Sequence, residues 1–180
     1  RLVKLSYFKK RISFNGLVLA QTSVTAAKLK SIYGIKNVVI VPNAVSIDNY
    51  ENIITKDFML PQKTNLLYLT YYYPHKNLEI FLPLAKKIKD NNLDFRIVIT
   101  IDKTQHVKAR QLLEKIKILK LDDIIINVGA VHMRDVPSLY KQCNGLLMPT
   151  LLESFSGTYV EAMHHEIPIF TSNFDFADAV

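Results

Sequence analysis

The sequence has few of the residues and segments that mark several common protein classes. Its 180 residues include five glycines, no tryptophan and a single cysteine, Cys143. One cysteine cannot form an internal disulfide and is typical of a reducing compartment, so we expect a cytoplasmic protein. No apolar run approaches the roughly 18 to 20 residues that a membrane-spanning helix needs, and the first residues lack the pattern of a signal peptide.

Two missing motifs and the spacing of the histidines argue against three kinds of functional site. No G-x-G-x-x-G motif follows a predicted strand, which argues against a dinucleotide-dependent oxidoreductase. No G-x-S-x-G motif surrounds a serine, which argues against a hydrolase with a nucleophile elbow. The histidines His75, His132, His164 and His165 are not spaced as zinc ligands, so we expect no metal site.

What is present is enough apolar sequence for one good core. Hydrophobic residues make up 49% of the chain, which is too short for two full-sized domains, so we expect one domain with additional elements. The formal net charge of +7 favours anionic partners: nucleic acid, an anionic membrane surface or a phosphorylated small molecule. We do not expect nucleic acid, because no reading module or interleaving of basic and aromatic residues is found; an RNA-binding module would show steeply salt-dependent binding.

Apolar, β-branched runs alternate along the chain with segments of helical pattern. Such alternation predicts βαβ units in an α/β fold, with a Rossmann-like, doubly wound parallel sheet that binds ligands beyond the carboxyl ends of its strands. The predicted strands are Leu17–Ala20, Val38–Val41, Asn65–Thr70, Phe95–Ile101, Ile124–Gly129, Gly145–Thr150 and Ile167–Ser172. The predicted helices are Ser23–Tyr33, Lys76–Asn91, Thr104–Lys120, Asp135–Cys143 and Gly157–His165.

Two stretches depart from this alternation. Residues Pro42–Thr64 are polar, carry prolines and show no clear period, so we predict a linker over 43–64 and a domain boundary there. Residues Arg1–Ile12 alternate basic and apolar side chains at helical spacing. We expect a helix docked on a neighbour by Leu2, Leu5 and Phe8, with a membrane-surface helix as the alternative.

The stretch "ESFSGTYVE" stands where a predicted strand gives way to a predicted helix. Glu153 follows the strand at the carboxyl edge of the sheet, and Glu161 lies about one turn into the helix. The amides of Ser156, Gly157 and Thr158 open the helix and favour an anionic group such as a phosphate. Carboxylates accept hydrogen bonds from vicinal hydroxyls, so the two glutamates can flank a polyhydroxylated ligand; a surface glutamate and a charge near a helix end would fit equally well.

A second loop at the same edge favours a ligand. After the strand Asn65–Thr70 comes "YYYPHKN", which places His75 and Lys76 in the first turn of a predicted helix. A lysine at a helix N-terminus is unfavourable unless an anion is near. A diphosphate would supply that anion.

Three segments in this order, "VIVPNAVSI", "YYYPHKNLE" and "VGAVHMRDVPSLYKQCNGLLMPTLLESFSGTYVEAMHHEIPIFTSN", resemble the C-terminal, donor-binding half of the group 1 (family 4) retaining glycosyltransferases, which have the GT-B fold. The resemblance runs from about Leu17 to the end of the chain. Its most specific part is the pair of glutamates separated by seven residues, Glu153 and Glu161.

This resemblance implies transfer of a sugar, with retention, from a nucleotide sugar to an acceptor hydroxyl. It implies that Glu153 contacts donor-sugar hydroxyls and Lys76 the diphosphate, as the two catalytic residues, and that Glu161 binds the ribose. The remaining donor-binding residues that it implies are Ser156, Gly157 and Thr158 at the phosphates, Gly129, Ala130 and Val131 at the base, and His75. Such enzymes need no metal, because lysine and helix amides neutralise the leaving group; the chain has no Asp-x-Asp motif.

The chain departs from the family pattern at three places. Tyr71 occupies the position of an arginine that usually contacts the diphosphate, and Arg134 is a weak candidate to replace it. The family's "PNG" is "PNA" at Pro42–Ala44, and the glycine that usually follows "ESF" is displaced by one position. Either another basic residue replaces the arginine or the phosphate site is weaker; the change in the linker is mild, and the displaced glycine shifts the amide geometry.

The resemblance also implies how the chain is divided. We predict that 1–42 is the tail of the N-terminal Rossmann-like domain, and that 65–180 is a truncated nucleotide-sugar-binding domain. The chain is then a fragment that binds nucleotide sugar weakly and turns over negligibly without its N-terminal domain. The expected partners are a nucleotide sugar, a carbohydrate or lipid-linked acceptor, and a peripheral contact with the inner face of the membrane, in polysaccharide or glycolipid synthesis. The alternative is a catalytically silent nucleotide-binding or scaffolding domain of the same fold.

Overall fold

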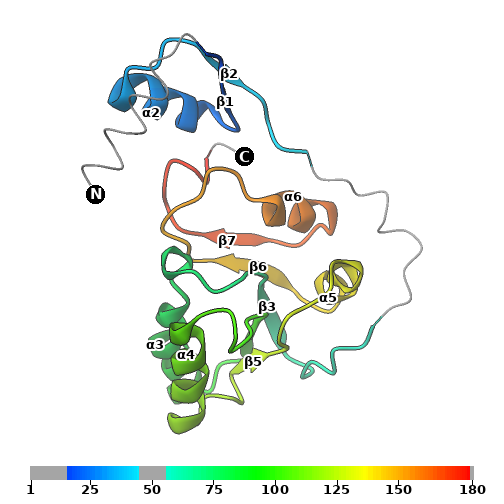
Figure 1. Ribbon diagram of the computed structural model, residues 1–180. Coiled ribbons are helices and arrows are strands. Elements are labelled where there is room, and N and C mark those ends of the chain that lie inside the picture. Colours follow the sequence, from blue (N-terminus) through cyan, green and yellow to red (C-terminus); the bar gives the residue numbers. More distant parts are fainter. Residues whose placement is uncertain (1–15, 45–55, 179–180) are drawn as a thin grey trace. The chain divides into compact units, whose positions relative to one another are not determined.

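The computed structural model describes residues 16–44 and 56–178, which form two compact units (Figure 1). The first, here the N-terminal unit, comprises Arg1–Ala44, Glu153–Gly157 and Asn173–Val180. The second, here the sheet unit, comprises Val45–Leu152 and Thr158–Ser172. The predicted helix over Arg1–Ile12 lies outside the described residues.

The N-terminal unit is a single βαβ element with added segments. Strand β1 (Val18–Ala20) pairs in parallel with β2 (Val38–Ile40), and α2 (Ser23–Tyr33) connects them. The hydroxyl of Thr22 caps α2 by accepting from the amide of Thr25 at 3.2 Å, and Gly34, with φ of 70°, ends it. Both strands and the helix were predicted correctly.

Later parts of the chain join this unit through polar contacts. The hydroxyl of Ser154 donates to Oε1 of Gln21 at 2.8 Å, and Nζ of Lys28 lies 2.7 Å from Oδ2 of Asp175. These contacts accompany the grouping of 153–157 and 173–180 with the N-terminal unit.

The sheet unit contains a five-stranded parallel sheet in the order β5-β4-β3-β6-β7. The order reverses beside β3: the chain moves outward from β3 to β4 and β5, and then returns to β6 and β7 on the other side. The carboxyl ends of β3 and β6 therefore form the topological switch point at which doubly wound sheets bind ligands. The strands are β3 (Thr64–Tyr68), β4 (Phe95–Ile99), β5 (Ile125–Asn127), β6 (Gly145–Met148) and β7 (Ile169–Thr171).

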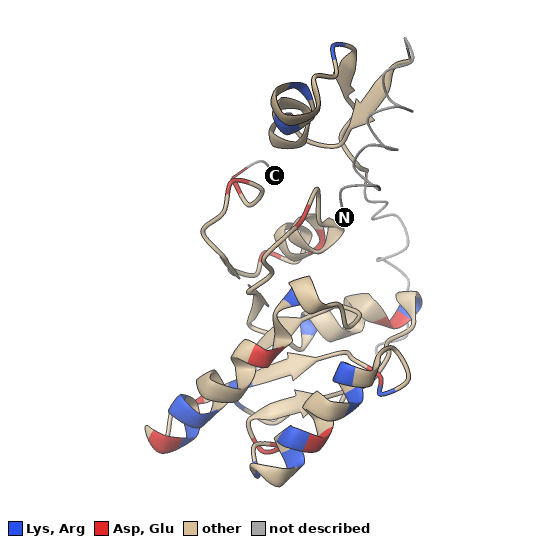
Figure 2. Ribbon diagram, turned by 60° about the vertical axis from the view of Figure 1, so that its left-hand side comes forward, with Lys and Arg blue, Asp and Glu red and all other residues tan. Residues whose placement is uncertain are grey.

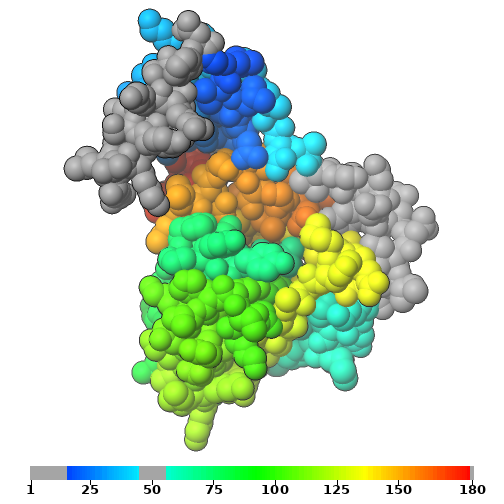
Figure 3. Space-filling view, viewed as in Figure 1, coloured from blue at the N-terminus to red at the C-terminus, as the bar shows by residue number. Residues whose placement is uncertain are grey.

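Helices cover both faces of this sheet (Figure 1). On one face lie α3 (Phe81–Asp90) and α4 (Val107–Ile118), and on the other α5 (Val136–Lys141) and α6 (Gly157–His164). Helix α3 buries Phe81, Ala85 and Ile88, spaced by four and three residues as expected for one helix face. Figure 2 shows charged residues along the two long helices, which agrees with solvated outer faces, and Figure 3 shows the residues of α4 (green) and α5 (yellow) at the surface of the sheet unit.

The core lies between the sheet and these helices. Tyr68 packs edge-on against Phe81, with ring centroids 5.7 Å apart. Cys143 is buried, as predicted for a small apolar side chain, and burial raises the pKa of its thiol to about 12. The largest fully buried side chains are Tyr68, Tyr72, Tyr140, Phe81, Leu67, Leu78, Ile97, Ile99, Ile101, Leu139, Leu146 and Met148. The α/β, Rossmann-like prediction is confirmed.

Part of the predicted linker packs on the sheet unit. The amide of Lys56 donates to Oγ of Ser138 at 3.1 Å, the amide of Phe58 donates to Oε1 of Gln142 at 2.9 Å, and Phe58 packs against the core. Residues 45–55 lie outside the described part, so the domain boundaries stay a prediction.

Within 16–44 and 56–178, none of the helices combines the length and the apolar character needed to cross a bilayer.

Candidate functional site

The loops that follow β3 and β6 are joined at the carboxyl edge of the sheet. The carbonyl oxygen of His75 accepts from the amide of Leu151 at 2.8 Å and from the hydroxyl of Thr150 at 3.2 Å. Nδ2 of Asn77 donates to the carbonyl oxygen of Pro149 at 3.1 Å. The loops meet because β3 and β6 are parallel neighbours, so the prediction that they share one edge is confirmed.

The segment that carries Lys76 differs from the predicted helix start. It forms two short 3-10 turns, η2 (Pro74–Lys76) and η3 (Leu78–Ile80), and the α-helix begins only at Phe81. The prediction was wrong there because Asn77 has φ of 55°, which interrupts a helix. Lys76 is half-buried, and its carbonyl oxygen accepts from the hydroxyl of Tyr68 at 2.9 Å, which fixes the turn to the core.

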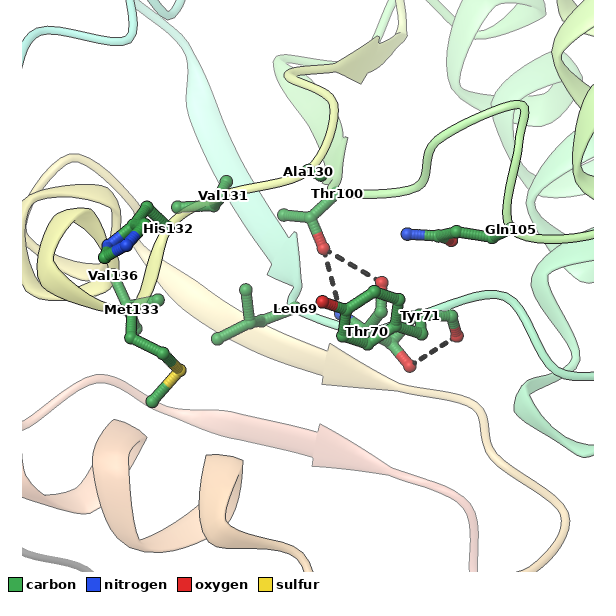
Figure 4. A pocket seen from close by; sticks show the side chains of 10 residues that line it. All are labelled: Leu69, Thr70, Tyr71, Thr100, Gln105, Ala130, Val131, His132, Met133 and Val136. Carbon is green, nitrogen blue, oxygen red and sulfur yellow. Dashed lines mark hydrogen bonds between the residues drawn. The ribbon is translucent and has the colours of Figure 1, made fainter.

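A pocket of about 540 Å³ opens at the carboxyl ends of β3, β4 and β5 (Figure 4). Its side chains come from three consecutive strand ends that the sheet brings together. The lining residues are Leu69, Thr70, Tyr71, Thr100, Gln105, Ala130, Val131, His132, Met133 and Val136.

Hydrogen bonds hold the wall of this pocket in place. Oγ of Thr100 accepts from the amide of Thr70 and donates to its carbonyl oxygen, both at 3.0 Å, and Oγ of Thr70 donates to the carbonyl oxygen of Tyr71 at 2.9 Å. Oε1 of Gln105 accepts from the amide of Tyr72 at 3.0 Å. The pocket is therefore formed before any ligand enters it.

Tyr71 and Tyr72 have opposite roles in this loop. Tyr71 is 64% exposed and lines the pocket, whereas Tyr72 is buried and donates from its hydroxyl to Oε1 of Glu79. Burial, followed by the bond to Glu79, raises the pKa of Tyr72 above its usual range, and its ring stacks on His106 at 5.4 Å. Tyr72 thus anchors the loop and leaves Tyr71 facing the pocket.

Two of the three residues predicted to contact the nucleotide base line this pocket. Ala130 and Val131 line it, and Gly129 does not. Gly129 has φ of 74°, and its amide donates to Oδ1 of Asn127 at 3.3 Å, so it forms the turn that brings the next two residues to the pocket. Arg134 follows on the 3-10 turn η4 (Met133–Asp135), with Nε 3.6 Å from Oδ1 of Asp135.

Glu161 lies on α6 and is only 8% exposed. The hydroxyl of Tyr140, a fully buried residue of α5, donates to Oε2 of Glu161 at 3.0 Å. His165 stacks on the Tyr140 ring at 5.1 Å, and burial, followed by the charges of His164 and Lys141, lowers the pKa of His165. Sequence reasoning missed Tyr140 and His165, because the contact between α5 and α6 leaves no local pattern.

The remaining predicted residues divide between the two units. Glu153, Ser156 and Gly157 belong to the N-terminal unit, whereas Thr158 and Glu161 belong to the sheet unit. Oγ of Thr158 donates to Sδ of Met148 at 3.1 Å. That Glu153 and Glu161 flank one ligand stays a prediction.

A second pocket, of about 660 Å³, lies between α4 and the edge strand β5. Charged side chains of both signs line it, and none of the predicted site residues does. Among the described residues, no cluster of three histidine, cysteine, aspartate or glutamate side chains is arranged to hold a metal ion.

The sequence matches the family described as Glycosyl transferases group 1 over residues 63–180. It is 24% identical, over 126 residues, to the O-antigen chain mannosyltransferase RfbU of Salmonella typhimurium, covering 69% of this chain and 34% of that protein. The chain thus spans about a third of this relative's length.

Solved structures show the same fold at low sequence identity. Anabaena Alr3699/HepE in complex with UDP and glucose superposes with a TM-score of 0.77 at 16% identity, covering 99% of this chain and 50% of that one. Sucrose-phosphate synthase from Thermosynechococcus elongatus also gives 0.77 at 16% identity, covering 96% and 44%. These neighbours are glycosyltransferases of the GT-B type, of which this chain spans half or less. The chain belongs to the group 1 glycosyltransferases, and its Rossmann-like α/β fold is that of one half of a GT-B enzyme.

Proposed function

We propose that the sheet unit binds the nucleotide of a nucleotide sugar at the carboxyl edge of its sheet. The complete enzyme then transfers the sugar, with retention, to an acceptor hydroxyl in polysaccharide or glycolipid synthesis. The preformed pocket at the ends of β3, β4 and β5 carries this proposal, because it adjoins the switch point of a doubly wound sheet. The similar proteins include a mannosyltransferase and a protein solved in complex with UDP and glucose, which agrees with the proposal.

The roles within the site follow from charge and hydrogen-bonding capacity. Lys76 supplies a cation for the diphosphate, and Glu161 accepts from the ribose hydroxyls. Ala130 and Val131, with the turn at Gly129, hold the nucleotide base. The carbonyl oxygen of His75 supports the loop that carries Lys76 through its contacts with the loop after β6. Glu153 accepts from hydroxyls of the sugar, and the amides of Ser156, Gly157 and Thr158 bind phosphate oxygens.

In the transfer step, negative charge builds on the leaving diphosphate as the bond to the sugar breaks. Lys76 and the helix amides stabilise that charge where it develops, so the chemistry needs no metal ion. The departing phosphate oxygen takes the proton of the acceptor hydroxyl, which attacks from the same face of the sugar. Neither glutamate then acts as a nucleophile.

The replacement of the usual arginine by Tyr71 weakens the diphosphate site. The lining of the pocket includes no lysine or arginine side chain, so Lys76 carries most of the phosphate charge from the sheet unit. We infer that this chain binds nucleotide weakly and turns over negligibly without an N-terminal domain that supplies the acceptor site. We place the complete enzyme in the cytoplasm, peripheral to the inner face of the membrane.

Isothermal titration of the 180-residue chain with UDP, GDP and their sugars tests the proposal. Loss of the ribose contact in Glu161→Ala should weaken binding about 10- to 100-fold, since hydrogen bonds to a charged group contribute about 1.5 to 3 kcal/mol. Glu114→Ala makes the same change on the exposed face of α4 and should bind as the parent does. Failure to bind any nucleotide, or equal binding by Glu161→Ala and the parent, would overturn the proposal.

A catalytically silent nucleotide-binding or scaffolding domain is the second candidate, favoured by Tyr71. It predicts that the complete protein binds nucleotide with the same dependence on Glu161 and gives no transfer. An assay of donor consumption with the complete protein separates the two, because only the first predicts consumption.

A further inference from the structure

One side chain of the pocket has a hydrogen-bond donor fixed in direction and not used by the protein. Gln105 comes from the loop between β4 and α4, and its amide reaches the pocket beside Tyr71 (Figure 4). Oε1 of Gln105 accepts from the amide of Tyr72 at 3.0 Å. Nε2 makes no hydrogen bond with any other residue of the described ranges 16–44 and 56–178.

The orientation of this amide is fixed by its partner. A backbone N–H can only donate, so the oxygen of Gln105 must face Tyr72 and the NH₂ group must face away from it. Rotating the amide by half a turn would set two donors against each other at a half-buried position. A free glutamine can turn either its donor or its acceptor end toward a ligand, whereas the end of the Gln105 amide that faces away from Tyr72 offers only a donor.

Several other polar groups of the pocket are hydrogen-bonded within the protein, whereas the exposed hydroxyl of Tyr71 has no fixed direction. The hydroxyls of Thr100 and Thr70 are engaged with the backbone of the same loop (Figure 4). Nδ1 of His132 accepts from the amide of Arg134 at 3.3 Å, which ties that ring to its own turn. Gln105 is therefore well placed to read a ligand.

The lining has no lysine, arginine or carboxylate side chain and is largely apolar, which suits an uncharged ring better than a phosphate. We propose that Gln105 is a specificity-determining residue, whose Nε2 donates to the base oxygen that stands where cytosine and adenine carry their amino group, which is O4 of uracil or O6 of guanine. The site then favours the keto bases uracil and guanine over the amino bases cytosine and adenine, because an amino group would meet the donor of Gln105. This inference rests on the proposed function of the pocket.

Gln105→Glu separates base reading from a structural role. The carboxylate has the same shape and still accepts from the amide of Tyr72, but its second oxygen presents an acceptor to the pocket. The new charge also weakens the binding of every nucleotide alike. The informative quantity is therefore the ratio of the affinity for the keto-base nucleotide to the affinity for the amino-base nucleotide.

The experiment is isothermal titration of the 180-residue chain with UDP against CDP, and with GDP against ADP. We expect the parent to bind the keto member of each pair about tenfold more tightly, which corresponds to one hydrogen bond of about 1.4 kcal/mol. Gln105→Glu should bring each ratio to one or below it. Gln105→Met removes the donor without adding charge and should bring each ratio to about one.

The outcomes separate this inference from the proposed function. A parent chain that binds all four nucleotides alike, or that prefers the amino bases, would overturn the role of Gln105 and leave the pocket as a nucleotide site. The same conclusion follows if Gln105→Glu and Gln105→Met keep the parent's ratios. A parent chain that binds no nucleotide would overturn the proposed function, and the inference with it.

Discussion

The hydroxyl of Tyr140 joins α5 to the carboxylate of Glu161 on α6, and its removal tests how that carboxylate is held. Tyr140→Phe deletes one oxygen from a side chain with no exposed area. The ring stays, so its stacking on His165 at 5.1 Å is retained. The change therefore reports on the hydroxyl and leaves the packing of the ring intact.

The magnitude follows from the charge of the acceptor. A hydrogen bond to a charged group contributes about 1.5 to 3 kcal/mol, against about 0.5 to 1.5 kcal/mol for a neutral pair. The hydroxyl of Tyr140 donates to a carboxylate oxygen at 3.0 Å and lies 3.3 Å from the carbonyl oxygen of Thr158. We expect Tyr140→Phe to lower the free energy of unfolding by about 1.5 to 3 kcal/mol.

Tyr68→Phe is the matched control. Tyr68 is also fully buried, and its hydroxyl donates at 2.9 Å to a neutral acceptor, the carbonyl oxygen of Lys76. Urea unfolding followed by circular dichroism measures both variants, and Tyr68→Phe should lose about 0.5 to 1.5 kcal/mol. Equal losses for the two variants would refute the argument that the charge of Glu161 strengthens the bond.

Two further predictions concern the backbone and pH. In Gly145→Ala the new Cβ would lie 3.2 Å from the carbonyl oxygen of Pro168, so we expect the free energy of unfolding to fall by about 1 to 3 kcal/mol. In Gly129→Ala the new Cβ meets open space, so the free energy of unfolding should fall by about 1 to 2 kcal/mol because of the positive φ alone. Gly145→Ala with parental stability in urea unfolding would contradict this. Burial, His164 and Lys141 hold the pKa of His165 below its ordinary value of 6.5, so the unfolded chain takes up this proton first and stability should fall as the pH drops from 7.5 through that value. His165→Phe keeps a ring against Tyr140 and should flatten this dependence in melting curves recorded from pH 7.5 to 5; an unchanged slope would show that His165 is not its source.

The sequence predicted elements whose ends carry local signals. Helix α2 was predicted at Ser23–Tyr33, the bounds that the structure shows, and the structure caps it with Thr22 before and Gly34 after, both residue types that commonly end helices. The strands of the sheet were found because they are apolar runs separated by helical segments. These features depend on residues that are near one another in the chain.

The parts that the sequence did not reveal depend on residues far apart. The left-handed Asn77 turned the predicted start of α3 into two 3-10 turns, which contacts with the loop after β6 support. The bond between Gln105 and Tyr72 spans 33 positions, and that between Tyr140 and Glu161 spans 21. The order of the strands, which creates the pocket, is likewise a property of the whole chain.

The most direct test of the central claim is to locate a bound nucleotide on the chain by NMR. Titration of the ¹⁵N-labelled chain with UDP and GDP should shift the amide signals of Leu69–Tyr71 and Ala130–Met133, which line the pocket at the carboxyl edge of the sheet. Shifts confined to residues beside the second pocket, such as Arg110, Lys117 and Asn127, or the absence of any shift with either nucleotide, would contradict it.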